Sequence, residues 1–333
     1  MCRIGDYVSI VRKGQLKDGD LVAYLPEASI VPDSILIELG LLGKLAGVNN
    51  NRIKAVKLRK VLSQGIVYPA KPHWVEGQDV QEELGVTKWD PPIPAALRGA
   101  VGNGGLGITF DVENIKKYPD AFVEGETVIF TEKIHGTCFI ATLYPEDLRQ
   151  EDMIEGKLAV ISKGLGKQNL YFKDIEDNAR NVYVRVAKKY SLASQMELLF
   201  STMIAKSQTV RIFGEVFGDI QDLRYGYGAG EIDLRVFGLK IGGNWISWDL
   251  METYVKSIDL KVVPVLYKGP FSKQVMLDYT KGKESVSGKE THMREGIVIY
   301  PEHERIIRDL GRVVLKSVSE EYLLRKGEAT EFT

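Results

Sequence analysis

The pattern of apolar and polar positions changes its character along the chain. Up to about residue 70, short alternating runs such as DYVSIVRK (6–13) and IKAVKLRKVLSQGIVYPA (53–70) predict short strands. Between them, the apolar residues of 35–45 predict one short helix. Short strands with a single helix favour a small closed barrel, so we expect an OB-like β-barrel module at this end of the chain.

From residue 123 onwards extended runs dominate, and one helical block interrupts them. Apolar residues recur at helical spacing between 173 and 205, namely at Ile175, Val182, Val186, Met196, Leu199 and Met203. Ahead of this region, Asp111 is placed to cap a short helix that ends before Pro119. The whole pattern predicts an α+β fold, in which the barrel module is followed by antiparallel sheets with flanking helices.

A stretch rich in proline and glycine, residues 69–108, separates the two patterns. It contains PPIP at 91–94 and GNGGLG at 102–107, and it predicts a connector. We therefore expect a module with its linker in residues 1–100 and a second domain in residues 101–333. GNGGLG does satisfy G-x-G-x-x-G, but a dinucleotide site needs a strand before this motif and a helix opening within it. The proline-rich context argues against such a site.

Size and composition are typical of a globular protein of two domains. The chain has 333 residues, and a single core rarely grows beyond about 250 to 300. No apolar run approaches the roughly 20 residues of a membrane helix, and no charged-then-apolar leader is present. Cys2 and Cys138 cannot form a disulfide framework or a metal site alone. We expect a monomer without membrane segments in a reducing, cytoplasmic setting.

The net charge of −1 does not by itself indicate a nucleic-acid binder. Charge is nevertheless uneven, because residues 1–60 hold ten Lys and Arg against six Asp and Glu. Half of these bases form one cluster, namely Arg52, Lys54, Lys57, Arg59 and Lys60. The cluster predicts either a phosphate-binding strand or a solvated strand face, and charge alone does not choose between them.

The most informative run for chemistry is TEKIHGT, residues 131–137. Lys133 follows the apolar run 128–130, and His135 and Gly136 follow Lys133. An amine held beside a tight turn suits nucleophilic attack. The pattern is weak alone, with about one chance match in ten chains of this length at average residue usage. Its value comes from five later runs, which are SKG (162–164), FGEVFG (213–218), LRVFGL (234–239), REGIVIY (294–300) and VVLKS (313–317).

This series resembles the motifs of covalent nucleotidyltransferases, the superfamily of DNA ligases, RNA ligases and mRNA capping enzymes. Within the superfamily, the chain is similar to ATP-dependent RNA ligases of the Deinococcus type. Those enzymes carry an OB-like module before a nucleotidyltransferase (ATP-grasp-like ligase) domain. The motif resemblance covers residue 128 to the C-terminus, and the resemblance of the first hundred residues is looser.

The resemblance implies a role for each motif. Lys133 would take AMP from ATP, and Lys316 would neutralise the α-phosphate. Glu215 and Glu295 would contact the ribose and a hydrated Mg²⁺ (or Mn²⁺), which supplies the partners that a carboxylate among apolar neighbours needs. The remaining nucleotide contacts would come from Phe237 and Val298 on the two faces of adenine and from Glu132, His135, Gly136 and Lys163.

To attack, Lys133 must be neutral, although an unperturbed lysine has a pKa near 10.4. Partial burial and a second cation nearby would favour the neutral amine, and Lys316 is the candidate cation.

The chain departs from the family pattern at four positions. His135 stands where many relatives carry Asp, and the alternative for it is a hydrogen-bonded core histidine. Lys163 stands where the superfamily often has Arg, and it keeps a point charge for phosphate without the bidentate fork. Cys138 replaces a frequent Asn, and Val314 replaces the first lysine of Lys-x-Lys, so each change puts one polar contact in doubt.

The resemblance therefore predicts an RNA ligase (ATP) that joins a 3′-hydroxyl RNA end to a 5′-phosphate end at nicks in duplex nucleic acid. Lysyl-AMP and an AMP-capped 5′-phosphate would be the intermediates. One alternative is a capping-type guanylyltransferase, against which the lack of an OB domain after Lys316 argues. The other is an RNA-binding protein with a decayed catalytic domain. The changes at Cys138 and Val314 favour it, and the retained Lys133, Glu215, Glu295 and Lys316 argue against it.

Overall fold

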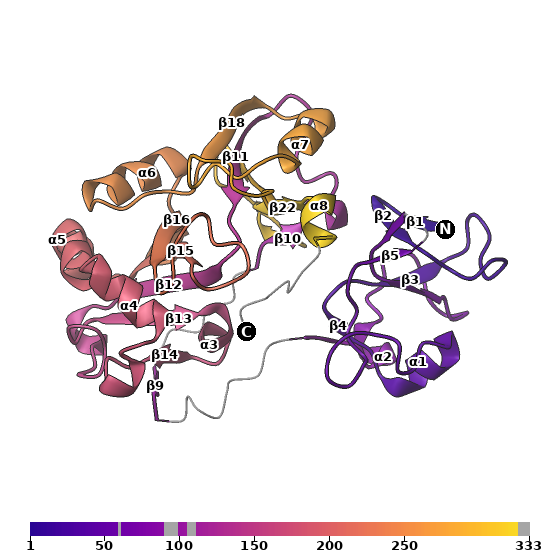
Figure 1. The fold of residues 1–333 in the computed structure, drawn as a ribbon, viewed down its shortest axis with the longest axis horizontal. Helices are drawn as coiled ribbons and strands as arrows, with labels where there is room; N and C mark the ends of the chain where they lie inside the picture. The colour runs from indigo at the N-terminus through magenta and orange to yellow at the C-terminus, as the bar shows by residue number, and fades with distance from the viewer. Residues whose placement is uncertain (59–60, 90–98, 105–110, 326–333) are drawn as a thin grey trace. The chain divides into compact units, whose positions relative to one another are not determined.

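The computed structural model describes residues 1–58, 61–89, 99–104 and 111–325, and the chain divides into two compact units, Met1–Pro91 and Pro92–Thr333. Each unit has its own core, and each is described separately (Figure 1). No helix among the described residues is long and apolar enough to cross a membrane.

The first unit consists of short strands around two short helices. Its strands are β1 (Cys2–Ile4), β2 (Tyr7–Ser9), β3 (Val22–Leu25), β4 (Ser29–Ile30), β5 (Val56–Leu58), β6 (Val61–Ser63), β7 (Ile66–Pro69) and β8 (Thr87–Lys88), and its helices are α1 (Asp33–Leu39) and α2 (Gln81–Leu84). The strands pair as β1–β2, β3–β7, β4–β8 and β5–β6, all antiparallel. Val31, Leu36 and Ile53 are the most deeply buried residues of its core.

Two predictions for the first unit differ from the structure. Within residues 1–58 and 61–89 the strands form four separate two-stranded sheets and no closed barrel, because these pairs are not joined into one continuous sheet. The helix predicted over 35–45 begins at Asp33 and ends at Leu39. Gly40 stops it by taking a left-handed conformation, φ 67°, from which its N–H bonds back to Ile37.

The second unit is built on two sheets. The larger sheet is antiparallel throughout, with the order β17-β16-β15-β12-β13-β14-β9. Its strands are β9 (Val101–Asn103), β12 (Thr137–Leu143), β13 (Leu158–Ser162), β14 (Leu170–Phe172), β15 (Val210–Gly218), β16 (Ile232–Ile241) and β17 (Asn244–Trp245).

The smaller sheet has the order β10-β22-β19-β11-β18, and only its β10–β22 pair is parallel. Its strands are β10 (Glu113–Asn114), β11 (Thr127–Lys133), β18 (Val265–Pro270), β19 (Gly296–Pro301) and β22 (Leu315–Val318), and a separate hairpin joins β20 (Ile306–Ile307) to β21 (Gly311–Arg312). The predicted antiparallel sheets of this domain are confirmed.

Helices and 3-10 turns connect the strands, and several of them pack against the two sheets (Figure 1). They are η2 (Ile115–Lys117), η3 (Glu146–Leu148), α3 (Lys163–Lys167), η4 (Glu176–Asn178), α4 (Val182–Lys189), α5 (Leu192–Ile204), α6 (Trp248–Ser257), α7 (Lys273–Thr280) and α8 (Glu320–Leu323). The helical block predicted over 173–205 is confirmed by α4 and α5, which pack on β12, β13 and β15. The helix predicted before Pro119 is a single 3-10 turn, and Asn114 caps it instead of Asp111.

Candidate active site

Lys133 is the last residue of β11, and a three-residue turn leads from it into β12 at Thr137. Gly136 lets this turn approach β15 closely. A Cβ atom on Gly136 would lie 2.2 Å from the carbonyl oxygen of Val216 and 3.0 Å from the Glu215 side chain. The Val216 backbone leaves no room for that atom, so this position of the turn requires glycine.

Two carboxylates face the Lys133 amine. Glu295 immediately precedes β19, whose first residue, Gly296, lies opposite Lys133 in the sheet, and Glu295 Oε1 is 2.6 Å from Lys133 Nζ. Glu215 lies within β15, opposite Cys138 of β12. Burial raises the pKa of Glu215 to about 8, although the positive charge of Lys133 acts against this shift.

The protonation of Lys133 differs from the sequence-based expectation. Burial does act to lower its pKa, but the carboxylates of Glu295 and Glu215 outweigh burial and raise it. Lys316, in the middle of β22, is near enough to repel Lys133, and burial together with this repulsion lowers the pKa of Lys316. The arrangement therefore keeps Lys133 protonated as long as no added cation lies beside the two carboxylates.

One cavity collects most of the predicted residues. Its lining includes Glu132, Lys133, Lys163, Glu215, Phe237, Val298 and Lys316. Phe237 comes from the larger sheet, and Val298 comes from the smaller one, so the cavity is lined by both sheets. Phe237, Val298 and Val263 make one part of it apolar. Tyr300 also lines it, and period-2 alternation from Val298 along β19 could have predicted this residue.

An acidic side chain that the sequence did not suggest for the site, that of Asp111, lies beside one of the lysines of the cavity. Lys163 is the first residue of α3, and its Nζ lies 2.7 Å from Oδ1 of Asp111, which also lines the cavity. Asp111 was predicted only as a helix cap. It follows the GNGGLG run, whose residues 105–107 lie outside the described part of the chain.

Glu132 presents a buried carboxylate to the same cavity. Its Oε2 accepts hydrogen bonds from the backbone N–H and the hydroxyl of Ser285, at 2.7 and 2.5 Å. Its Oε1 is buried and has no hydrogen-bond partner among the described groups, and burial raises the pKa of Glu132. A nucleotide amino group would satisfy this oxygen. No local motif marks Ser285, because it meets Glu132 only through the tertiary fold.

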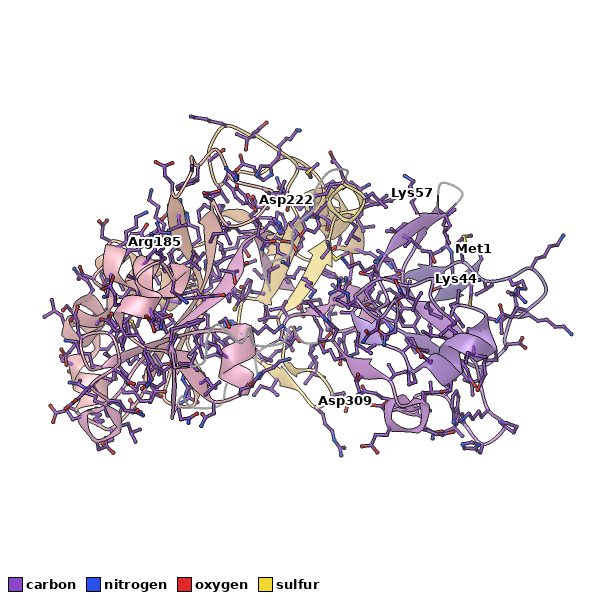
Figure 2. The ribbon with its side chains drawn as sticks, turned by 60° about the horizontal axis from the view of Figure 1, so that its bottom comes forward. Met1, Lys44, Lys57, Arg185, Asp222 and Asp309 are labelled. Atoms are coloured by element: carbon purple, nitrogen blue, oxygen red, sulfur yellow. The ribbon has the colours of Figure 1, made fainter. Side chains whose placement is uncertain are left out.

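His135 does not line this cavity. Its side chain is 5% exposed, its Nε2 lies 2.9 Å from Asp222 Oδ1, and its Nδ1 lies 2.9 Å from the hydroxyl of Tyr322. The burial and the two engaged ring nitrogens correspond to the alternative of a hydrogen-bonded core histidine. Asp222 is labelled in Figure 2, beside the yellow C-terminal elements.

The carboxylates suit a cation that keeps its water shell. Glu295 Oε2 is buried without a hydrogen-bond partner among the described groups, as is Glu132 Oε1. In the described ranges, however, no three Asp, Glu, His or Cys side chains are close enough together to hold a metal ion directly. Glu215 and Glu295 therefore fit indirect contact through water, which is how Mg²⁺ is often held.

A protein-family model described as RNA ligase matches residues 126–318. A search of the curated proteins found no significant match.

Solved structures of an RNA ligase from Naegleria gruberi are similar over most of the chain. The structure with PPi has a TM-score of 0.71 at 22% identity and covers 97% of this chain and 91% of that chain. A mutant with ATP and Mn has a TM-score of 0.73 at 21% identity, with coverage of 97% and 91%. A mutant without ligands has a TM-score of 0.70 at 21% identity, with coverage of 95% and 89%. At these identities the likeness concerns the fold.

Proposed function

The chain belongs to the RNA ligase family, and from this premise we propose that it is an ATP-dependent ligase that joins a 3′-hydroxyl RNA end to a 5′-phosphate end. One observation carries the proposal. The amine of Lys133 lies 2.6 Å from Glu295 at a cavity that also holds Glu215, Lys163 and Lys316. A nucleophile, acidic groups for a metal and cations for phosphates thus meet in one place.

The reaction has three steps. Neutral Lys133 Nζ attacks the α-phosphorus of ATP and releases one proton to solvent as the P–N bond forms, the α–β phosphoanhydride bond breaks, and pyrophosphate leaves. An oxygen of the RNA 5′-phosphate then attacks the same phosphorus and displaces Lys133, which regains a proton. Finally the 3′-hydroxyl oxygen attacks the 5′-phosphorus and loses its proton, a phosphodiester forms, and AMP leaves.

The first step requires Lys133 to lose a proton, and the carboxylates control this loss. Both of them raise the pKa of Lys133, so any positive charge added beside Glu215 and Glu295 lowers it again. When bound, a hydrated Mg²⁺ or Mn²⁺ supplies that charge and also neutralises phosphate oxygens. Glu295 Oε2, which is buried without a hydrogen-bond partner among the described groups, supports such a site. The Naegleria gruberi ligase structures with ATP and Mn support it as well.

The other lining residues divide into a nucleobase end and a phosphate end. Phe237 and Val298 would stack on the two faces of adenine, and Glu132 would accept from its amino group. Lys163 and Lys316 would contact phosphates, and Lys316 would stabilise the charge that develops at the α-phosphorus. His135 and Gly136 would act from the turn that carries the nucleophile.

The first unit would hold the nucleic acid, and the basic cluster predicted from the sequence supports this role. Lys54 and Lys57 are exposed there, whereas the Arg52 guanidinium lies 4.1 Å from the centre of the Trp89 ring. Arg59 and Lys60, the other members of the predicted basic cluster, lie outside the described residues. A nicked duplex is the proposed substrate. Exposed lysines in this unit can bind the phosphates of a duplex whatever its base sequence.

Incubation with ATP or GTP labelled at the α-phosphate tests the function. ATP should leave a covalent, acid-labile label on the protein, and Lys133→Ala should abolish it, because the other two amines of the cavity, those of Lys163 and Lys316, are assigned to phosphate contacts. A label from GTP alone would indicate a guanylyltransferase. No label from either nucleotide would leave only the alternative of a non-catalytic RNA-binding protein.

A further inference from the structure

The turn that follows Lys133 is clamped from two sides by residues distant in sequence. From the segment 221–225, the Gln221 amide donates to the Gly136 carbonyl, and the Tyr225 hydroxyl accepts from the backbone N–H of His135 at 2.6 Å. The second set of contacts comes from the C-terminal end of the described chain. Tyr322 of α8 bonds to His135, and Arg325, two residues after α8, bonds to Asp222.

These contacts fit one arrangement of protons. The Asp222 carboxylate is held ionised, because Arg325, at 2.7 Å, and His135 lower its pKa despite burial. An ionised carboxylate only accepts, so His135 Nε2 carries the hydrogen toward Asp222. In neutral imidazole Nδ1 is then an acceptor, and it receives the hydroxyl hydrogen of Tyr322. Burial lowers the pKa of His135, in agreement with the neutral ring.

The N-cap of helix α8 also contacts the backbone at Glu295, whose carboxylate pairs with Lys133. The N–H of Ser319, the N-cap of α8, donates to the backbone carbonyl of Glu295 at 2.8 Å, and the Ser319 hydroxyl donates to Arg294 O at 3.1 Å. The Ser319 hydroxyl oxygen in turn accepts from the N–H of Tyr322. One helical turn therefore joins the backbone beside Glu295 to the imidazole two residues after Lys133.

We propose that Tyr322 and Asp222 are positioning residues for the nucleophile: they hold His135, and through it the Lys133–Gly136 turn, in register with Glu295. The inference rests on the proposed role of Lys133. Its physical basis is that a displacement of about 1 Å at a reacting group can reduce a rate about 100-fold. Neither Tyr322 nor Asp222 lines the cavity, so both act on the amine only through the turn.

The test is single-turnover adenylylation of full-length Tyr322→Phe with labelled ATP. The change removes one hydroxyl and keeps the ring. The rate constant at saturating ATP should fall about 10-fold, which corresponds to about 1.4 kcal/mol. The ATP concentration for half-maximal rate should stay the same, because Phe237, Val298 and Lys163 are untouched. Sealing of a nick that already carries AMP on its 5′-phosphate should fall much less, because that step forms no bond to Lys133.

Tyr190→Phe is the matched control. The Tyr190 hydroxyl donates to the buried carboxylate of Asp233, as the Tyr322 hydroxyl donates to the buried imidazole of His135, and neither Tyr190 nor Asp233 lines the cavity. This control should lose comparable stability and keep the wild-type adenylylation rate. If both variants slow adenylylation equally, or if only the fraction of labelled protein falls, Tyr322 has a general structural role and the inference is overturned.

Asp222→Asn provides a second variant should Tyr322→Phe not fold. Asparagine keeps the size of the side chain and removes the charge that pairs with Arg325. It should lower the same rate constant and leave half-saturation unchanged, and a wild-type rate would overturn the inference. Absence of any adduct on the wild-type protein is a different result, because it would refute the proposed function and the inference with it.

Discussion

At the scale of single residues, the site depends on how charge is balanced in a buried place. Lys133 and Glu295 are in contact, and Glu215 lies close to both, so the protonation of Lys133 depends on the two carboxylates. Sequence analysis predicted that Lys133, Glu215 and Glu295 belong to one site. It could not predict the direction of the pKa shift at Lys133, because that direction depends on distances set by the tertiary fold.

Glu215 gives the clearest pH dependence. Its pKa in the fold, about 8, lies above the value of an unfolded glutamate. Its contribution to stability is therefore fully present below the unfolded pKa, near 4.3, and is lost as pH rises through 8. In EDTA, the wild-type protein should lose stability relative to Glu215→Gln as pH rises from 5 to 8. The difference in the free energy of unfolding should be on the order of a few kcal/mol, and it is measured as a fall in the wild-type Tm relative to that of the variant. Glu320→Gln, an exposed change on α8, controls for charge, and a pH-independent gap would contradict the assignment.

Asp111 should compete with the substrate for Lys163. The pair is partly exposed, so its energy is small, and Asp111→Asn should lower half-saturating ATP in adenylylation by about 2- to 5-fold. Asp174→Asn removes a comparable ion pair, with Lys188, away from the cavity and should have no effect. An increase in half-saturating ATP for Asp111→Asn would show instead that Asp111 assists binding.

At the scale of elements, the sheets were easier to predict than their ends. Runs such as FGEVFG and REGIVIY form β15 and β19 because their apolar residues are buried on both faces. Helix α1 was predicted too long because Gly40, which ends it, lies inside an apolar run. Which strands become neighbours could not be predicted, since β11 pairs with β19 and β18, more than 130 residues away in sequence.

Gly136 tests how tightly the turn between β11 and β12 is constrained. Gly136→Ala would place a Cβ 2.2 Å from the Val216 carbonyl oxygen, so either β12 or β15 must move. Overpacking of this kind typically costs about 1–3 kcal/mol, and we expect Tm to fall and adenylylation to be nearly lost. Gly243→Ala, in the turn after β16, has no atom within 4 Å and should be tolerated. Wild-type labelling by Gly136→Ala would show that the turn can relax.

At the scale of the whole molecule, the two units were predicted with unequal success. The motif series collects at one cavity because the strands that carry it pair across two sheets. The first unit carries no such series, and its predicted closed barrel is absent from residues 1–58 and 61–89. Short alternating runs indicate strands, but barrel closure depends on pairing of the outermost strands, which no local pattern encodes.

We propose that the first unit binds the nucleic acid and the second unit reacts with ATP. Replacing exposed lysines of the first unit by alanine tests this proposal. Lys54 and Lys57 are exposed near the β5–β6 hairpin, and Lys13 and Lys17 are equally exposed in another part of the same unit. If the basic cluster grips phosphates, Lys54→Ala with Lys57→Ala should weaken binding to a nicked duplex. It should also flatten the log–log salt dependence by about one unit per lost contact.

Adenylylation of Lys133 should be unchanged in this double variant, because ATP needs only the cavity of the second unit. The pair Lys13→Ala and Lys17→Ala removes the same charge and should leave the salt slope unchanged. Equal weakening by both pairs would mean that net charge, and not a defined surface, attracts the duplex. An unchanged slope for Lys54→Ala with Lys57→Ala would make that strand a solvated face, so the nick would have to be held by the catalytic unit itself.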